Sequence, residues 1–159
     1  MDKARLREAI IERLNSELDN LTRAALMARD EATHEESKPE NQYDMHAQEA
    51  AYLAEGQAKL AAELQASVAL YQAMELPVFS PIQFIALGTV VTLETTGRKL
   101  LYFLGPRNGG LEIAFDDSEI IVITLQSPLG RQLIGKRAGD LVITQSAGRT
   151  TTQRIAAVE

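Results

Sequence analysis

The first 76 residues carry a helical pattern that is broken only once, and this constrains the fold more than any other feature. Apolar side chains recur at steps of three or four residues, the spacing of one face of an α-helix. The first stripe consists of Leu6, Ile10, Leu14, Leu18, Leu21, Ala25, Ala28 and Ala32. A second, alanine-rich stripe consists of Ala47, Ala50, Leu53, Gln57, Leu60, Leu64, Ser67 and Tyr71. Because the connection at residues 33–41 is short, the two helices are predicted to be antiparallel neighbours that approach closely.

The pattern changes beyond Leu76, because Pro77 disfavours a helical conformation of the residue before it. Residues 77–82 are predicted to be a linker. Runs rich in β-branched and apolar residues then predict about five strands, within residues 90–93, 100–104, 120–123, 141–143 and 154–158. The chain is therefore expected to be α+β, with a helical hairpin at residues 1–76 and a small α+β domain at residues 83–159. Residues 80–159 are expected to fold independently.

Glycines indicate two turns between the predicted strands. Gly97 is predicted to lie in the first. Residues 105–110 contain three glycines and a proline. They lack the strand–loop–helix context of a phosphate-binding loop, so a hairpin turn is expected there.

Residues 127–135 are predicted to form one short helix with a signal at each end. Ser127 can cap its start, Pro128 suits its first turn, and Gly135 can end it in a left-handed conformation. Its predicted apolar face consists of Leu129, Leu133 and Ile134. A basic turn at residues 136–137 follows and leads into the strand near residue 141.

Charge is divided unevenly between the two halves. Residues 1–76 hold eight Lys or Arg against fifteen Asp or Glu, net −7, and residues 77–159 hold eight against seven, net +1. An acidic hairpin repels phosphates, so it favours a basic protein surface or a metal ion as its partner over nucleic acid. There is no cysteine and no apolar run near the ~18 residues of a membrane span. We expect a cytoplasmic monomer without a membrane partner.

Residues 127–140, together with the predicted hairpin, resemble the Gre family of bacterial transcription elongation factors. The resemblance covers nearly the whole chain. It implies a coiled-coil hairpin followed by a small FKBP-like α+β domain that binds the rim of the secondary channel of bacterial RNA polymerase. The residues expected to contact the polymerase are Ser127, Pro128, Leu129, Lys136 and Arg137. The protein is then expected to contact nascent RNA and DNA only through the polymerase.

The resemblance also assigns a role to the hairpin tip. The family's cleavage-competent tip resembles Asp-x-x-Glu-Asn, and this chain has Ser37-Lys38-Pro39-Glu40-Asn41. Glu40 is expected to help hold the second Mg²⁺ of the polymerase active site, and no cofactor is expected in the free protein. Ser37 stands in place of the first acid, so Glu36 and Asp44 are candidate substitutes, while Ser37 and Asn41 support the tip. Two metal ions stabilise both the attacking and the leaving oxygens of phosphodiester hydrolysis.

Two of these assignments have structural alternatives. Ser37 and Glu40 also have the spacing of a capping box, in which both side chains satisfy backbone donors at a helix start. Lys136 and Arg137 are equally consistent with an ordinary basic turn.

The first functional hypothesis is an elongation factor that inserts its acidic tip into the secondary channel and stimulates cleavage of backtracked transcripts, without being an enzyme itself. The alternative is a non-cleaving secondary-channel regulator that modulates initiation or competes with cleaving factors. A more distant third is an adaptor whose hairpin binds another protein.

Overall fold

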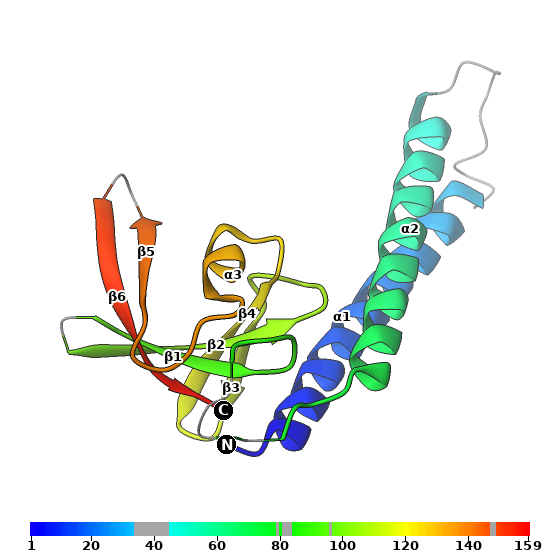
Figure 1. Cartoon of the computed structure of the whole chain (residues 1–159). Coiled ribbons are helices and arrows are strands. Elements are labelled where there is room, and N and C mark those ends of the chain that lie inside the picture. Colours follow the sequence, from blue (N-terminus) through cyan, green and yellow to red (C-terminus); the bar gives the residue numbers. More distant parts are fainter. Residues whose placement is uncertain (34–44, 79, 81–83, 96, 147–148) are drawn as a thin grey trace. The chain divides into compact units, whose positions relative to one another are not determined.

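Two helices precede a six-stranded sheet in the chain, so the predicted α+β class is confirmed (Figure 1). The computed structural model describes residues 1–33, 45–78, 80, 84–95, 97–146 and 149–159. The elements are α1 (Lys3–Thr33), α2 (Met45–Ala73), β1 (Val90–Thr95), β2 (Arg98–Gly105), β3 (Glu112–Phe115), β4 (Ser118–Thr124), α3 (Pro128–Leu133), β5 (Leu141–Ser146) and β6 (Arg149–Val158).

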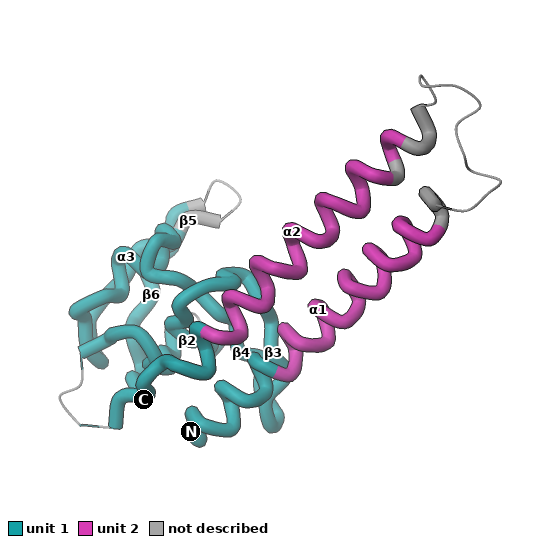
Figure 2. Tube along the Cα trace, turned by 90° about the vertical axis from the view of Figure 1, so that its right-hand side faces the viewer, with its two compact units in different colours: residues 1–11, 70–159 teal, residues 12–69 magenta. Residues whose placement is uncertain are grey.

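The chain divides into two compact units (Figure 2). Unit 1 consists of residues 1–11 and 70–159, and unit 2 consists of residues 12–69. The start of α1 and the end of α2 are thus grouped with the sheet. The predicted boundaries at residues 76 and 83 stay predictions about which segments fold independently.

Unit 1 is built on a single sheet with the strand order β3-β4-β2-β1-β6-β5. β2 and β4 are parallel, and every other neighbouring pair is antiparallel. The core on one side of the sheet contains Ile85, Val91, Leu93, Leu104, Ile123, Leu133, Val142, Ile155 and Val158. Leu133 comes from α3, so this short helix is held by the sheet core. Phe103 and Val122 are buried outside this cluster, as the alternation of side chains along a strand requires.

Two expectations about the strands were wrong. Strand β3 was not predicted. Its residues alternate between exposed and buried in the structure, but Ala114 is apolar at an exposed position, so the sequence lacks a clear alternation of polar and apolar residues. Residues 105–110 were expected to form a hairpin turn, but β4 lies between β2 and β3 in the sheet. The segment therefore crosses from β2 to a strand that is not its neighbour. The predicted turn at Gly97 is confirmed, with a φ of 80°.

The helix ends in unit 1 are fixed by side chains that reach across the chain. Tyr71 of α2 is completely buried, and its Oη donates a hydrogen bond to the carbonyl of Arg107 at 2.7 Å. Burial raises the pKa of Tyr71 well above its usual value. α2 ends at Ala73, before the predicted end at Leu76. Beyond this end, backbone carbonyls accept hydrogen bonds from side chains at the start of α1 instead of continuing the helix. Lys3 donates to the carbonyl of Pro77, and Arg7 donates to the carbonyl of Met74.

Replacing Tyr71 with phenylalanine is expected to lower the free energy of unfolding by about 1 kcal/mol, because the Arg107 carbonyl loses its donor. Urea denaturation of the full chain measures this. The matched control is Tyr52→Phe, because Tyr52 lies on α2 with its side chain 73% exposed. Equal stability of Tyr71→Phe and wild type would show that the hydrogen bond is unimportant.

Unit 2 contains the middle parts of the two helices, which run side by side in opposite directions (Figure 2). Leu14, Leu64 and Val68 are buried here. A groove of about 540 Å³ lies between the helices, and its lining includes Ala25, Ala54, Ala58, Ala61 and Ala62. The alanines therefore do not close the space between the helices.

The second predicted stripe is only partly correct. Leu53 and Leu60 are 57% and 51% exposed. The residues that line the groove are instead their neighbours one position further along the chain, Ala54 and Ala61. The predicted coiled coil stays a prediction. No helix in the described part of the chain is both long enough and apolar enough to span a membrane.

Candidate functional site

Helix α3 has the caps predicted for it. Ser127 Oγ accepts a hydrogen bond from the backbone N–H of Gly130 at 3.0 Å and donates one to the carbonyl of Thr124 at 2.8 Å. Pro128 occupies the first turn, where a missing N–H costs nothing. Gly135 has a φ of 74°, the left-handed conformation expected after a helix end. The direction in which α3 leaves β4 is therefore set by its own sequence.

The predicted apolar face of α3 is wrong at one position. Leu133 is completely buried and Leu129 packs against the sheet core, but Ile134 is 46% exposed. The helix ends at Leu133, and Ile134 has an extended conformation with φ −53° and ψ 131°. Its side chain therefore no longer follows the helical face.

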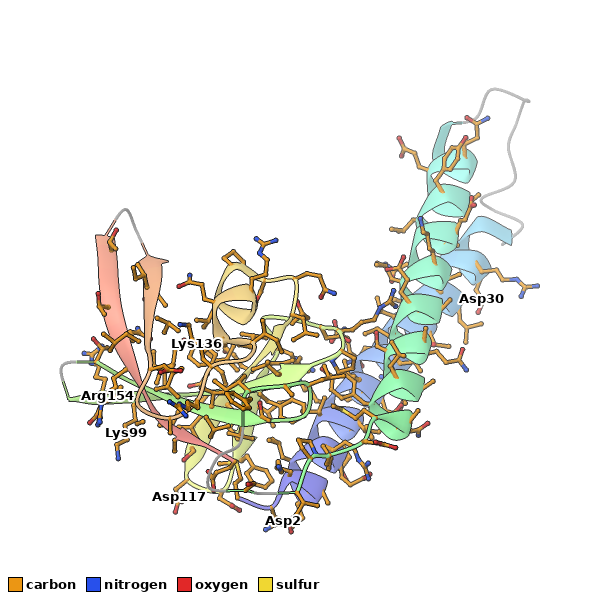
Figure 3. All side chains as sticks on the ribbon, viewed as in Figure 1. Asp2, Asp30, Lys99, Asp117, Lys136 and Arg154 are labelled. Atoms are coloured by element: carbon orange, nitrogen blue, oxygen red, sulfur yellow. The ribbon has the colours of Figure 1, made fainter. Side chains whose placement is uncertain are left out.

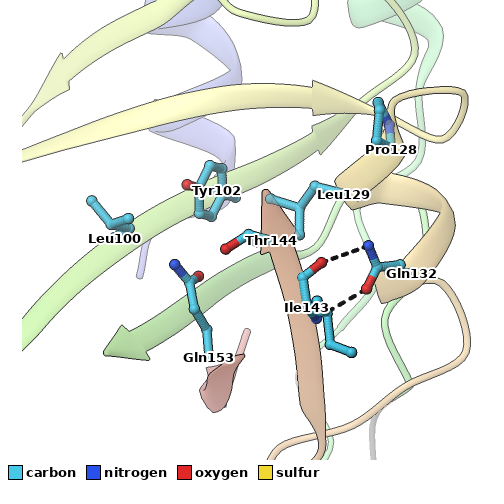
Figure 4. Close-up of a pocket in the computed structure, with 8 residues that line it drawn as sticks. All are labelled: Leu100, Tyr102, Pro128, Leu129, Gln132, Ile143, Thr144 and Gln153. Atoms are coloured by element: carbon cyan, nitrogen blue, oxygen red, sulfur yellow. Dashed lines mark hydrogen bonds between the residues drawn. The ribbon is translucent and has the colours of Figure 1, made fainter. Parts of the chain in front are cut away.

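A groove of about 880 Å³ lies beside α3 (Figure 4). Three strands of the sheet, together with α3, form its walls. The lining residues are Leu100 and Tyr102 of β2, Pro128, Leu129 and Gln132 of α3, Ile143 and Thr144 of β5, and Gln153 of β6. None of these side chains carries a formal charge at neutral pH, so the groove favours a neutral, largely apolar group.

Gln132 joins α3 to β5 through both ends of its side-chain amide. Its Nε2 donates to the carbonyl of Ile143 at 2.7 Å, and its Oε1 accepts from the N–H of Ile143 at 3.0 Å (Figure 4). β5 lies at the edge of the sheet, where unpaired backbone groups would otherwise accept another strand. The contact therefore keeps that part of the edge occupied and holds one wall of the groove.

The lining of the groove contains an unpaired polar group. Gln153 is 7% exposed, and its Oε1 is buried without a hydrogen-bond partner. A buried acceptor left unpaired costs about 1–3 kcal/mol. Tyr102 lies nearby on β2 (Figure 4), and burial raises the pKa of its phenol. The groove thus combines apolar walls with a few polar groups, as ligand and peptide sites commonly do.

The structure brings together only some of the residues predicted to contact a partner. Pro128 and Leu129 line the groove, whereas Ser127 acts as the cap of α3. Lys136 follows the helix (Figure 3). Its carbonyl accepts a hydrogen bond from the N–H of Ile85 at 2.7 Å. The Arg137 N–H donates to Asp140 Oδ2 at 3.0 Å, which closes the turn before β5. Lys136 and Arg137 do not line the groove, and their role as polymerase contacts stays a prediction.

The remaining groove residues were not found from the sequence. Leu100, Tyr102 and Ile143 belong to predicted strands, but nothing local shows which strand faces α3. Gln132 lies within the segment 127–140, but no role was assigned to it there, and no motif contains Gln153. Their roles follow only from the pairing of strands that lie far apart in the chain.

The predicted tip residues Glu36, Ser37, Glu40, Asn41 and Asp44 lie outside the described residues. In the part of the chain that is described, no three histidine or acidic side chains gather as metal ligands. The magnesium role of Glu40 therefore stays a prediction.

Comparison with known proteins finds likeness among solved structures. No family model and no curated protein matches the chain. The chain is similar to a structure of the transcription factor Gfh1, at 21% identity, with 93% of this chain and 92% of that chain covered and a TM-score of 0.40. It is also similar to GreA factor homolog 1 (Gfh1) of Thermus thermophilus, at 21% identity, with 94% of each chain covered and a TM-score of 0.39. Thermus aquaticus Gfh1 matches at 21% identity and a TM-score of 0.39, with 95% of this chain and 94% of that chain covered.

The chain resembles Gre factor homologues. The resemblance predicted from residues 127–140 and the helical hairpin agrees with the names of these structures.

Proposed function

We propose that this protein is a divergent member of the Gre family that binds bacterial RNA polymerase through the groove beside α3. The observation that carries the proposal is the placement of Pro128 and Leu129. Both belong to the segment that resembles the family's polymerase-binding signature, and both form a wall of the groove. The capped helix presents them on a rigid element, which lowers the entropic cost of binding.

The hairpin is the part that would act on the polymerase. Its predicted tip carries Glu36, Glu40 and Asp44, in the half of the chain with net charge −7. In the secondary channel these carboxylates would join the polymerase's own Mg²⁺, with Glu40 as the shared ligand, and support cleavage of backtracked transcripts. The protein would then be an accessory factor that acts in the cytoplasm as a monomer, and the nuclease activity would belong to the polymerase.

The alternative is a non-cleaving secondary-channel regulator that modulates initiation or competes with cleaving factors. The observation that favours it is Ser37, which stands where the cleavage-competent tip has its first acid. A neutral side chain at that position supplies one negative charge fewer to the metal ion.

The binding part of the proposal is tested by placing a charge in the groove wall. Pro128→Asp is expected to weaken binding to the cognate core polymerase by about tenfold, because a carboxylate must be desolvated in an apolar groove. The helix should tolerate this change, since an acid in the first turn is favourable. Fluorescence anisotropy with labelled full-length protein measures the dissociation constant.

The matched control is Gln126→Asp, which adds the same charge two residues earlier at an exposed position outside the groove lining. It should bind like wild type. If wild type forms no complex with the core polymerase at micromolar concentration and modest salt, the proposed function is wrong. If Pro128→Asp binds like wild type, or if the two variants lose affinity equally, the groove is not the polymerase-binding site.

A further inference from the structure

We propose that Gln153 determines which group the groove accepts, by taking a hydrogen bond from a backbone N–H of the docked partner. The identity of that partner as a polypeptide segment of the polymerase rests on the proposed function. The segment would place an apolar side chain between Leu129 and Tyr102 and its N–H over the floor of the groove.

Gln153 occupies a position where an apolar residue would serve the fold better. It lies on β6 opposite Val142 of β5, and Ile155, two residues further along the same strand, belongs to the sheet core. A methionine of similar length would fill this position without leaving an acceptor unpaired. The amide therefore costs the free protein stability, and a partner that supplies a donor would recover that cost.

Two other polar side chains of the groove lining, Gln132 and Thr144, are already engaged in hydrogen bonds. Gln132 uses both ends of its amide on Ile143, and Thr144 Oγ1 donates to the carbonyl of Thr151 at 3.3 Å. Gln153 Oε1 is buried and has no partner. It can turn toward an entering donor because the terminal torsion of a glutamine side chain is soft.

The lining also defines the chemistry of the occupant. Since none of the lining side chains is charged, an ionic ligand such as a phosphate or carboxylate would be desolvated without compensation. A backbone N–H next to an apolar side chain satisfies both the acceptor and the walls. The proposal therefore commits to a peptide segment as the occupant.

The test uses the full-length variant Gln153→Met and two measurements. Binding to the cognate core polymerase is expected to weaken by about threefold to tenfold, the effect of losing one hydrogen bond. The melting temperature of the free protein is expected to stay level or to rise by about 2–4 °C, because the unpaired acceptor is removed. A residue with a purely structural role would instead lower the melting temperature.

The matched control is Thr152→Val, which removes a polar group from the adjacent, exposed position on the opposite face of β6. It should leave polymerase binding unchanged. The proposal is overturned if Gln153→Met binds like wild type, or if its melting temperature falls. Failure of wild type itself to bind polymerase refutes the proposed function and with it the polymerase as the source of the donor.

Discussion

Replacing Gly130 with alanine is expected to lower the free energy of unfolding by about 3 kcal/mol, a larger effect than most single substitutions have. A Cβ at this position would lie 2.0 Å from the carbonyl oxygen of Thr124 and 3.0 Å from Ser127 Oγ. The Thr124 carbonyl cannot move away easily, because it ends β4 and accepts from both the N–H and the hydroxyl of Ser127. The close approach of α3 to β4 therefore requires a residue without a side chain.

Thermal denaturation followed by circular dichroism measures this effect, and a fall of roughly 10 °C is expected. Polymerase binding should weaken as well, because displacement of α3 moves Pro128 and Leu129 in the groove wall. The matched control is Gly56→Ala, the same substitution in the interior of α2, where a Cβ meets nothing within 4 Å. This variant should be more stable than wild type by up to about 1 kcal/mol. If Gly130→Ala melts like wild type, the close approach at Thr124 is wrong.

If the protein assists magnesium chemistry, the variant Glu40→Gln should slow transcript cleavage by about a hundredfold or more. The reason is that a lost carboxylate ligand removes several kcal/mol of transition-state stabilisation. Polymerase binding should stay unchanged, because residue 40 is not among the residues that line the groove. The assay measures cleavage of nascent RNA in purified stalled elongation complexes. Glu49→Gln is the matched control, since Glu49 is an exposed acid of α2 away from the predicted tip.

Ser37→Asp is the complementary change, because it restores the acid that the family's tip carries. Cleavage should increase, and the predicted capping role of residue 37 would be kept, since aspartate caps a helix as well as serine does. If wild type does not cleave and Ser37→Asp adds no activity, the regulator hypothesis replaces the cleavage factor. If Glu40→Gln lowers the melting temperature and leaves transcript cleavage unchanged, Glu40 is part of a capping box.

The sequence alone predicted the features that depend on residues close together in the chain. The stripe from Leu6 onward predicted α1, since helical packing repeats every three or four residues. Ser127, Pro128 and Gly135 predicted both ends of α3, because a cap satisfies donors and acceptors within one helical turn. The α+β class followed from the change of period after Pro77. The tip acids could be named only because the motif near Glu40 resembles that of a known family.

Only the tertiary structure decided which of these segments meet. The parallel pairing of β2 with β4 places β4 between β2 and β3, and this could not be predicted because strand order depends on contacts between distant segments. The order of the strands in the whole sheet brings Tyr102, Gln132 and Gln153 to one groove, although they are up to 51 residues apart in the sequence. Gly130 looks like an unfavourable residue in a helix until the carbonyl of Thr124 is seen beside it. Local propensity acts within a turn of the chain, whereas a groove and a close contact exist only after the sheet has formed.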